Sequence, residues 1–337
     1  MELTTVWFSL IAVLWIGYFC LEGFDFGVGM LLPVLARDDT ERRVLINTIG
    51  PVWDGNEVWL LVAGGATFAA FPEWYATLFS GFYLPLLLIL VALIVRGLAF
   101  EYRAKRDDDT WRRNWDLALI VGSFVPALLW GVAFGNILRG VPIDAGKEYT
   151  GGFFNLLTPY PLLGGVTTLL LFLTHGAMFI SLKTDGRIRA AARDLGFNLG
   201  IGAAVAAVLF LVWTQVKTGT VSSAIAFAVA AAALLAGLAA VRAGREGWAF
   251  TGTFVAIAAG VAGLFLALFP DVMPTTLGDG VSLTTSNAAA THYTLTIMTV
   301  VAVIFTPVVL AYQAWTYWVF RKRIAVHHIP PSPVRAG

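Results

Sequence analysis

Long apolar runs alternate with short polar connections along almost the whole 337-residue chain. A membrane-spanning helix needs about 20 mostly apolar residues, and nine segments meet this requirement. They lie near residues 6–34, 48–71, 76–101, 116–138, 159–183, 195–215, 221–241, 248–269 and 292–320. The pattern predicts an all-α polytopic membrane protein with nine transmembrane helices. A single transmembrane domain covers residues 1–320, and a polar tail follows over residues 321–337.

Positive charges gather on alternate connections. The connections after the first, third, fifth and seventh spans, with the residues just after the last span, carry seventeen Lys and Arg residues. The opposite connections carry only Arg139, Lys147 and Lys217. Cytoplasmic connections are enriched in Lys and Arg. The pattern therefore predicts an N-terminus outside, a C-terminus inside and a cytoplasmic tail.

Composition agrees with the membrane class and excludes several others. The chain is 58% hydrophobic and 13% charged, whereas soluble domains carry about 25% charged residues. No basic tract suits nucleic acid, and the single cysteine, Cys20, allows neither an internal disulfide nor a thiolate metal cluster. The first apolar run is far longer than the roughly 7–15 residues of a signal peptide core, and no Lys or Arg precedes it. We therefore expect it to remain as a transmembrane helix.

Four carboxylates lie in or beside the first two spans. Glu22 and Asp25 come late in the first span, and Asp54 and Glu57 come early in the second. Each pair is three residues apart and so shares one helix face. Because the connection between these spans is short, the four acids are expected at similar depth on two neighbouring helices. Ionisable groups inside a bilayer cost at least about 2–3 kcal/mol each, so a function is expected of them.

Two roles remain open for these acids. They can form a proton path leading inward from the cytoplasm. Burial raises the pKa of a carboxyl group, and a proton relay requires carboxyl groups with raised pKa values. Alternatively they form ion pairs that only fix helix packing, with Arg37, Arg42, Arg43 or Arg96 as the partners. Arg96 itself, deep in the third span, either snorkels to the headgroups or pairs with one of the acids.

The histidines are poor haem ligands. His175 lies inside the fifth span, and His292 opens the ninth span on the opposite side of the membrane. Two isolated histidines so placed do not form a bis-histidine haem pair. We predict hydrogen-bonded packing for His175 and an interfacial position for His292. No catalytic, cofactor-binding or metal-ligating residue is assigned to the chain.

Small residues accompany the acids. Gly23, Gly27 and Gly29, with Gly64 and Gly65, lie in the same region. No strand precedes Gly27-Val-Gly29, so a dinucleotide-binding turn is excluded. Glycines let membrane helices approach closely, and we interpret these as packing residues.

Several segments together resemble one family, subunit II of the cytochrome bd quinol:oxygen oxidases. They are Glu22-Gly-Phe-Asp25-Phe-Gly-Val-Gly29, Asp39-Thr-Glu-Arg-Arg43, Trp53-Asp54-Gly-Asn56-Glu57-Val-Trp59, Phe79-Ser-Gly-Phe-Tyr83, Gly122-Ser-Phe-Val-Pro126, Gly131-Val-Ala-Phe-Gly-Asn136, Gly140-Val-Pro142, Phe269-Pro-Asp-Val-Met-Pro274 and Tyr312-Gln-Ala-Trp-Thr-Tyr-Trp318. The resemblance runs from the first span to the last and is weakest over residues 184–250.

The resemblance implies a bacterial plasma membrane complex that oxidises quinol and reduces oxygen to water. It implies two four-helix bundles plus one extra helix, and a subunit I partner that holds haems b and d and the quinol site. Positions matching Asp25 and Asp54 are implied to line a cytoplasmic proton path, which generates a proton motive force without pumping. Quinol and lipid are the expected small partners. A structural quinone in this subunit and small accessory subunits stay open.

Two other functions remain as alternatives. A proton-coupled secondary transporter would also carry carboxylates within its spans, although matched broken helices are not evident. A scaffold subunit with no proton role is compatible with the family resemblance. Copurification with a haem-bearing partner distinguishes the oxidase from the transporter, and acid-to-amide substitutions distinguish a proton path from a scaffold.

Overall fold

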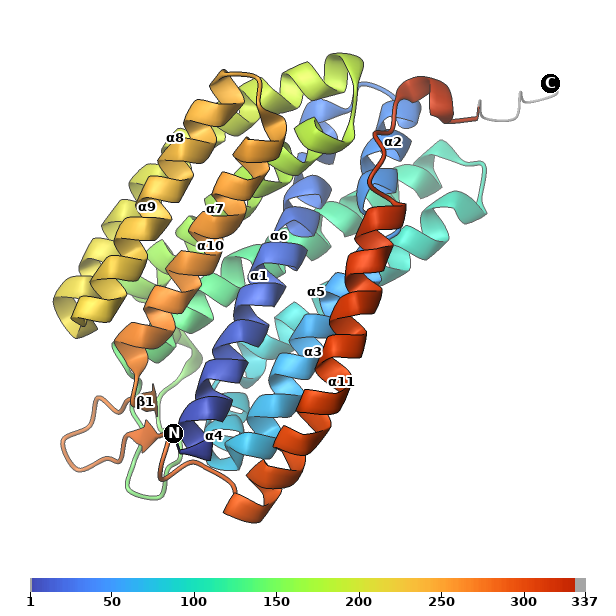
Figure 1. The fold of residues 1–337 in the computed structure, drawn as a ribbon. Helices are drawn as coiled ribbons and strands as arrows, with labels where there is room; N and C mark the ends of the chain where they lie inside the picture. The colour runs from blue at the N-terminus through green and yellow to red at the C-terminus, as the bar shows by residue number, and fades with distance from the viewer. Residues whose placement is uncertain (1, 331–337) are drawn as a thin grey trace.

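The computed structural model describes residues 2–330, which form a bundle of long helices (Figure 1). Eight helices in this range are long and apolar enough to cross a membrane. They are α1 (Leu3–Leu35), α5 (Tyr83–Tyr102, continued by η1, Arg103–Lys105), α6 (Asp109–Arg139), α7 (Pro159–Lys183), α8 (Gly186–Thr218), α9 (Val221–Arg242), α10 (Glu246–Leu268) and α11 (His292–Val319).

Helix α3 (Trp53–Ala70) occupies the predicted second span and runs beside α1 and α11 (Figure 1). It has 18 residues and is not among the eight, because its first turns carry Asp54, Asn56 and Glu57. The count of nine crossings therefore remains a prediction. The chain begins and ends its described part at opposite ends of the bundle (Figure 1).

Two predicted spans are divided in the structure. Residues 48–71 begin inside a separate helix, α2 (Asp39–Ile49), and the break at Gly50–Val52 separates it from α3. Asp38 starts α2 because its side chain accepts a hydrogen bond from the Glu41 amide at 2.9 Å. Residues 76–101 are likewise divided at Phe82 into α4 (Pro72–Gly81) and α5. Hydropathy averages over such breaks and cannot locate them.

Helix α1 is the centre of the bundle. It packs against α3, α6, α7 and α10, and Figure 1 shows it between the α7–α10 group and the pair α3 and α11. Gly27 of α1 meets Gly176 of α7, where an added Cβ would lie 2.8 Å from the Gly176 Cα. The packing interpretation of Gly27 is confirmed, whereas Gly64 and Gly65 have nothing within 4 Å of a Cβ position.

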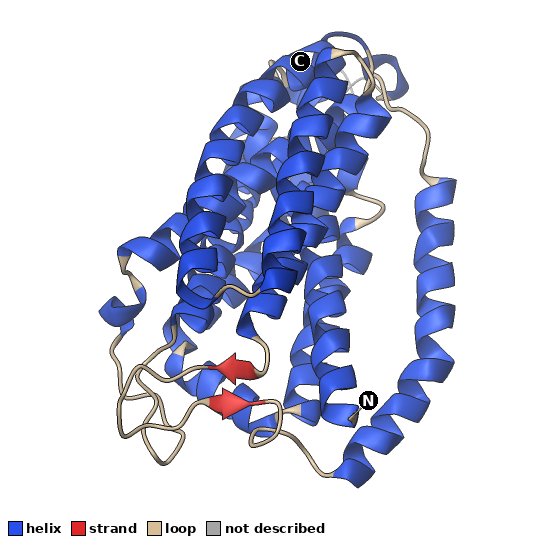
Figure 2. Cartoon of the chain, turned by 60° about the vertical axis from the view of Figure 1, so that its left-hand side comes forward, coloured by secondary structure: helices blue, strands red, loops and turns tan. Residues whose placement is uncertain are grey.

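The connections at the N-terminal end of α1 pack on each other. Strands β1 (Asp271–Met273) and β2 (Leu283–Thr284) form a two-stranded antiparallel sheet (Figure 2). Val141, from the connection between α6 and α7, bridges to Thr275 beside it. The short η2 helix (Phe153–Leu156) lies in the same connection. This end is the one that the charge pattern predicts to face outside.

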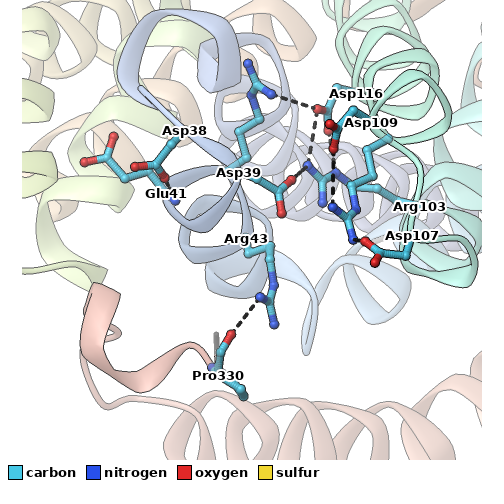
Figure 3. Close-up of polar contacts among 11 residues, drawn as sticks. Asp38, Asp39, Glu41, Arg43, Arg103, Asp107, Asp109, Asp116 and Pro330 are labelled. Carbon is cyan, nitrogen blue, oxygen red and sulfur yellow. Dashed lines mark hydrogen bonds and ion pairs between the residues drawn. The ribbon is translucent and has the colours of Figure 1, made fainter. Parts of the chain in front are cut away.

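Ion pairs hold the opposite end together (Figure 3). Arg103 contacts Asp116 at 2.5 Å and Asp39 at 2.6 Å, and Arg42 lies 3.7 Å from Asp116. These contacts join α2 to η1 and α6. The basic residues used to predict orientation are thus also structural residues of this end.

The described part of the tail docks on the bundle. The Ile324 amide donates to the Lys183 carbonyl at 2.8 Å, and Arg43 donates to the Pro330 carbonyl at 2.9 Å (Figure 3). A short helix, η3 (Val326–His328), lies between these contacts. The predicted polar extension therefore packs against α7 and α2 as far as residue 330. Residues 331–337 lie outside the described residues.

Candidate functional site

The two acids of α1 lie in the protein interior. Glu22 and Asp25 are both 0% exposed. Gly23 and Gly27 lie against α7, since a Cβ on Gly23 would lie 2.7 Å from the Phe172 ring, and Gly29 lies against Ser123 of α6. Small residues on one face thus let α1 sit deep in the bundle while the acids occupy another face.

Arg96 of α5 is the charged partner of these acids. Its guanidinium is 0% exposed, forms an ion pair with Glu22 and lies 3.5 Å from Glu57 Oε2. It also lies over the ring of Phe26, 4.9 Å from the centroid. Arg96 therefore pairs with acids and does not snorkel to the membrane surface. A buried pair of this kind is held by mutual attraction because either charge alone would be costly.

Asp25 belongs to an adjoining chain of hydrogen bonds. Its Oδ2 accepts a hydrogen bond from Asn56 Nδ2 at 2.7 Å. Asn56 Oδ1 accepts from Tyr317 at 2.6 Å and from Gln313 Nε2 at 3.3 Å, and both donors come from α11. Trp59 donates to Gln313 Oε1 at 2.8 Å. Helices α1, α3 and α11 thus meet through one polar chain.

Asp54 stands apart from the other three predicted acids. It is exposed on the first turn of α3 and makes no hydrogen bond or ion pair with any described residue. The structure therefore brings Glu22, Asp25 and Glu57 together around Arg96 and leaves Asp54 on the surface. Of the four acids expected on the two neighbouring helices, three are buried or half-buried and one is exposed.

Several buried polar atoms of this cluster lack a protein partner. Among the described residues, no hydrogen bond reaches Glu22 Oε2, Asp25 Oδ1 or the Arg96 atoms Nε and Nη2. Buried polar atoms in proteins are nearly always hydrogen-bonded to protein or to water. These atoms are therefore free to bind water within the cluster.

His175 has a structural environment. Its Nδ1 lies 2.7 Å from the Thr253 hydroxyl, its Nε2 lies 3.0 Å from the Cys20 carbonyl, and its ring stacks on Phe250 at 4.6 Å. Both ring nitrogens are engaged, so the predicted role in hydrogen-bonded packing is confirmed. His292 is exposed at the start of α11. Within residues 2–330, no group of three or more His, Cys, Asp and Glu side chains is placed to hold a metal ion.

Gln313 and Tyr317 are members of the site that were not predicted from the sequence. Their signal was present, because a glutamine inside a 28-residue apolar helix indicates an interhelical hydrogen bond. Tyr317 follows Gln313 by four residues and so lies on the same helix face. Asn56 contributed to the prediction only as part of the segment Trp53–Trp59 that carries the family resemblance.

Comparisons with known proteins agree with this architecture. The family model for cytochrome bd terminal oxidase subunit II matches residues 3–320. The chain is 42% identical over 329 residues to the cytochrome bd ubiquinol oxidase subunit 2 of Bacillus subtilis (strain 168), covering 96% of this chain and 97% of that protein. It is 37% identical over 362 aligned positions to the cytochrome bd-I ubiquinol oxidase subunit 2 of Escherichia coli (strain K12), covering 96% of each.

A solved structure shows the same fold. A chain of the bd oxidase from Geobacillus thermodenitrificans superposes with a TM-score of 0.78 at 17% identity, covering 95% of this chain and 99% of that chain. The apolar helices and the relatives together define a multi-pass protein of the bacterial inner membrane and a member of an oxidoreductase complex. The chain belongs to the cytochrome bd terminal oxidase subunit II family, which confirms the resemblance found in the sequence.

Proposed function

We propose that this chain is the partner of a haem-bearing subunit I in a quinol oxidase, and that it carries protons from the cytoplasm toward the site of oxygen reduction. The observation that carries the proposal is the buried cluster of Glu22, Asp25 and Glu57 around Arg96. Membrane proteins place ionisable side chains inside their spans mainly along ion and proton pathways.

The residues of this chain have distinct parts in the proposed path. Asp54, exposed at the predicted cytoplasmic end of α3, receives protons, and Glu57 lies one helical turn further along the same helix. Arg96 holds Glu22 and Glu57 in place and offsets their charge. Asp25 accepts a hydrogen bond from Asn56 and stands at the inner end of the path.

The proposed path accounts for energy conservation without a pump. Reduction of one oxygen molecule to two waters consumes four electrons and four protons. Subunit I supplies the electrons from quinol, whose protons leave on the outer side. Protons drawn through this chain come from the cytoplasm, so charge separates across the membrane with each turnover.

The experiment is oxygen consumption by the purified complex carrying Asp54→Asn or Asp25→Asn, beside its haem absorbance spectrum. We expect normal haem content and a turnover lowered by about 100-fold, the lower end of the range for loss of a proton-transfer group. Glu73→Gln is the control, because Glu73 is an exposed acid of α4 outside the cluster.

Other results would favour the alternatives. Normal turnover with normal haems in both variants would make the chain a scaffold and move proton entry to subunit I. Loss of haem would make these acids assembly residues. A protein that purifies without a haem-bearing partner and shows uptake activity would support the transporter.

A structural quinone is a secondary part of the proposal. A cavity of about 470 Å³ lies between α1, α3, α4, α5 and α6, with an almost wholly apolar lining that includes Trp15, Trp74 and Trp130. The buried indole nitrogen of Trp74 has no hydrogen-bond partner among the described residues, so it is free to donate to a quinone carbonyl. The residues fit an apolar ring with one hydrogen-bond acceptor.

The quinone is tested by solvent extraction of the purified complex. We expect Trp74→Phe to lower the quinone recovered per haem, because the ring is kept and only the donor is lost. An unchanged quinone content would reject this cavity as the site.

A further inference from the structure

We propose that Gln313 and Tyr317 of α11 are positioning residues for Asp25, acting through the side-chain amide of Asn56. The inference rests on the proposed function, because it assigns a role to Asp25 in the proton path. It adds α11, the last and most exposed long helix of the bundle, to the machinery that controls that path.

Trp59 fixes the direction of the hydrogen bonds that run from it through Gln313 and Asn56 to Asp25. The Trp59 indole nitrogen can only donate, so the oxygen of the Gln313 amide must face it, at 2.8 Å. The nitrogen of Gln313 therefore faces Asn56, at 3.3 Å. Gln313 donates to Asn56 Oδ1, and the nitrogen of Asn56 is left to face Asp25.

Tyr317 reinforces the same orientation. Its hydroxyl donates to Asn56 Oδ1 at 2.6 Å. Asn56 Oδ1 thus accepts two hydrogen bonds from α11, and its Nδ2 donates to Asp25 Oδ2 at 2.7 Å. Rotation of the Asn56 amide by half a turn would set its nitrogen against the Gln313 nitrogen and its oxygen against the Asp25 carboxyl.

The orientation of the Asn56 amide decides whether a hydrogen-bond donor or an acceptor faces Asp25. A donor stabilises a carboxylate oxygen, whereas the amide oxygen of a reversed Asn56 would repel it or require a proton between the two oxygens. Gln313 and Tyr317 therefore hold Asp25 Oδ2 as a hydrogen-bond acceptor and leave Oδ1, which has no hydrogen-bond partner within residues 2–330, as the atom that exchanges protons.

The position of α11 in the fold makes its hydrogen bonds to Asn56 sensitive to movement of the helix. Apart from the polar chain, α11 is joined to α1 near its outer end, where Trp7 Nε1 lies 3.0 Å from the Thr299 hydroxyl. Figure 2 shows α11 at the edge of the bundle, connected through loops at both ends. A displacement of α11 relative to α3 would alter the hydrogen bonds of Asn56 before it altered the core.

The experiment uses the purified complex with Tyr317→Phe, Gln313→Leu or Tyr312→Phe. Tyr312 is the control, because it is an exposed tyrosine of the same helix outside the chain of hydrogen bonds. The first readout is the redox-induced infrared difference spectrum, in which the Asp25 carboxyl band is the one lost in Asp25→Asn. The second is oxygen consumption, measured in each variant with and without Asp25→Asn.

We expect the Asp25 band to move in Tyr317→Phe and Gln313→Leu and to stay in Tyr312→Phe. Turnover should fall by about fivefold, the factor for one buried hydrogen bond, and the fall should disappear when Asp25 is already Asn. The band is read per complex recovered, so a lower yield of either variant does not affect it.

Three results would overturn the proposal. They are an unmoved Asp25 band, the absence of any band that depends on Asp25, and a turnover loss of equal size with and without Asp25→Asn. A moved band together with normal turnover in Asp25→Asn would support the positioning role and reject the proton path, so the two failures are distinguishable.

Discussion

At the scale of single residues, the site is defined by charged groups that are buried in the protein interior. Glu22 and Arg96 are both fully buried and paired, and Glu57 lies within 3.5 Å of the same guanidinium. Arginine suits this position because it stays protonated in almost any environment. It therefore gives a constant positive charge next to carboxyl groups whose proton occupancy is expected to change.

Replacing Arg96 should be far more damaging than replacing an exposed arginine. In Arg96→Met the buried Glu22 loses its partner, and breaking a buried pair in this way costs about 3–5 kcal/mol. We expect the thermal midpoint of the purified complex, followed by haem absorbance, to fall sharply. Arg113→Met is the control, because Arg113 is exposed on α6.

A second substitution separates charge from packing. Arg96→Met combined with Glu22→Met removes both charges, and such a pair of apolar replacements is often neutral for stability. We expect the double variant to recover most of the lost midpoint. A double variant as unstable as Arg96→Met alone would show that Arg96 acts through its packing on Phe26 and Phe100.

The residue scale also shows what the sequence could predict of the site. Carboxylates in apolar spans are conspicuous, so Glu22, Asp25 and Glu57 were found. Their partner could not be chosen, because Arg96 is 74 residues from Glu22 along the chain and only helix rotation brings the two together. Asp54 was grouped with the buried acids because spacing places it on α3 but does not show which side of α3 faces the core.

At the scale of elements, α2 joins the ends of neighbouring helices through hydrogen bonds and ion pairs. Glu41 accepts a hydrogen bond from the Arg37 amide at 2.7 Å and another from Arg187 of α8 at 3.0 Å. Burial alone would raise the pKa of Glu41, but the hydrogen bonds from Arg187 and Arg37 outweigh it and lower the pKa below the ordinary value of 4.5. The charged form of Glu41 is thus the one that joins α2 to α8.

The hydrogen bonds of Glu41 make the stability of this end of the bundle depend on pH. A carboxyl whose folded pKa is lowered stabilises the protein fully above the ordinary value of 4.5, and this contribution is lost as the pH falls through the folded value. We expect Glu41→Gln to cost about 2 kcal/mol near pH 7, the range for a hydrogen bond to a charged group. The measurement is the thermal midpoint of the complex as a function of pH.

The difference between the parent protein and Glu41→Gln should narrow below pH 4.5, where Glu41 of the unfolded chain takes up a proton, and should close once the pH falls below the lowered folded pKa. Glu101→Gln, an exposed acid at the end of α5, should match the parent throughout. A constant difference at all pH values would mean that Glu41 acts through shape and not through charge.

The sequence predicted the elements better than their ends. Eight of the predicted spans correspond to apolar helices because hydropathy over about 20 residues is a strong signal. The breaks at Gly50–Val52 and Phe82 were missed because hydropathy averages over them, although Gly50-Pro51 is itself a turn signal. The polar first turns of α6 and α8 were also missed, because they extend beyond the apolar run.

At the scale of the whole molecule, one side of the bundle is incomplete. Asp54, Val58 and Leu61 follow each other at positions i, i+4 and i+7 of α3 and so share one face. Leu61 is 71% exposed and Val58 is 42% exposed. Asp54 lies at the predicted cytoplasmic end of this face, in reach of water, and the proposed proton path must lead from α3 to the haem-bearing subunit. We infer that subunit I covers this face, an inference that rests on the proposed function.

The single cysteine of the chain makes this face testable. Cys20 is 0% exposed, so a cysteine introduced on the surface is the one in this chain that a lipid-soluble maleimide will label. In the intact complex we expect Leu61→Cys to be protected, because subunit I lies over it. Val205→Cys on α8, where Val205 is 58% exposed on the far side of the bundle, should be labelled. Equal labelling of the two positions would place this face of α3 against lipid and reject the inferred contact with subunit I.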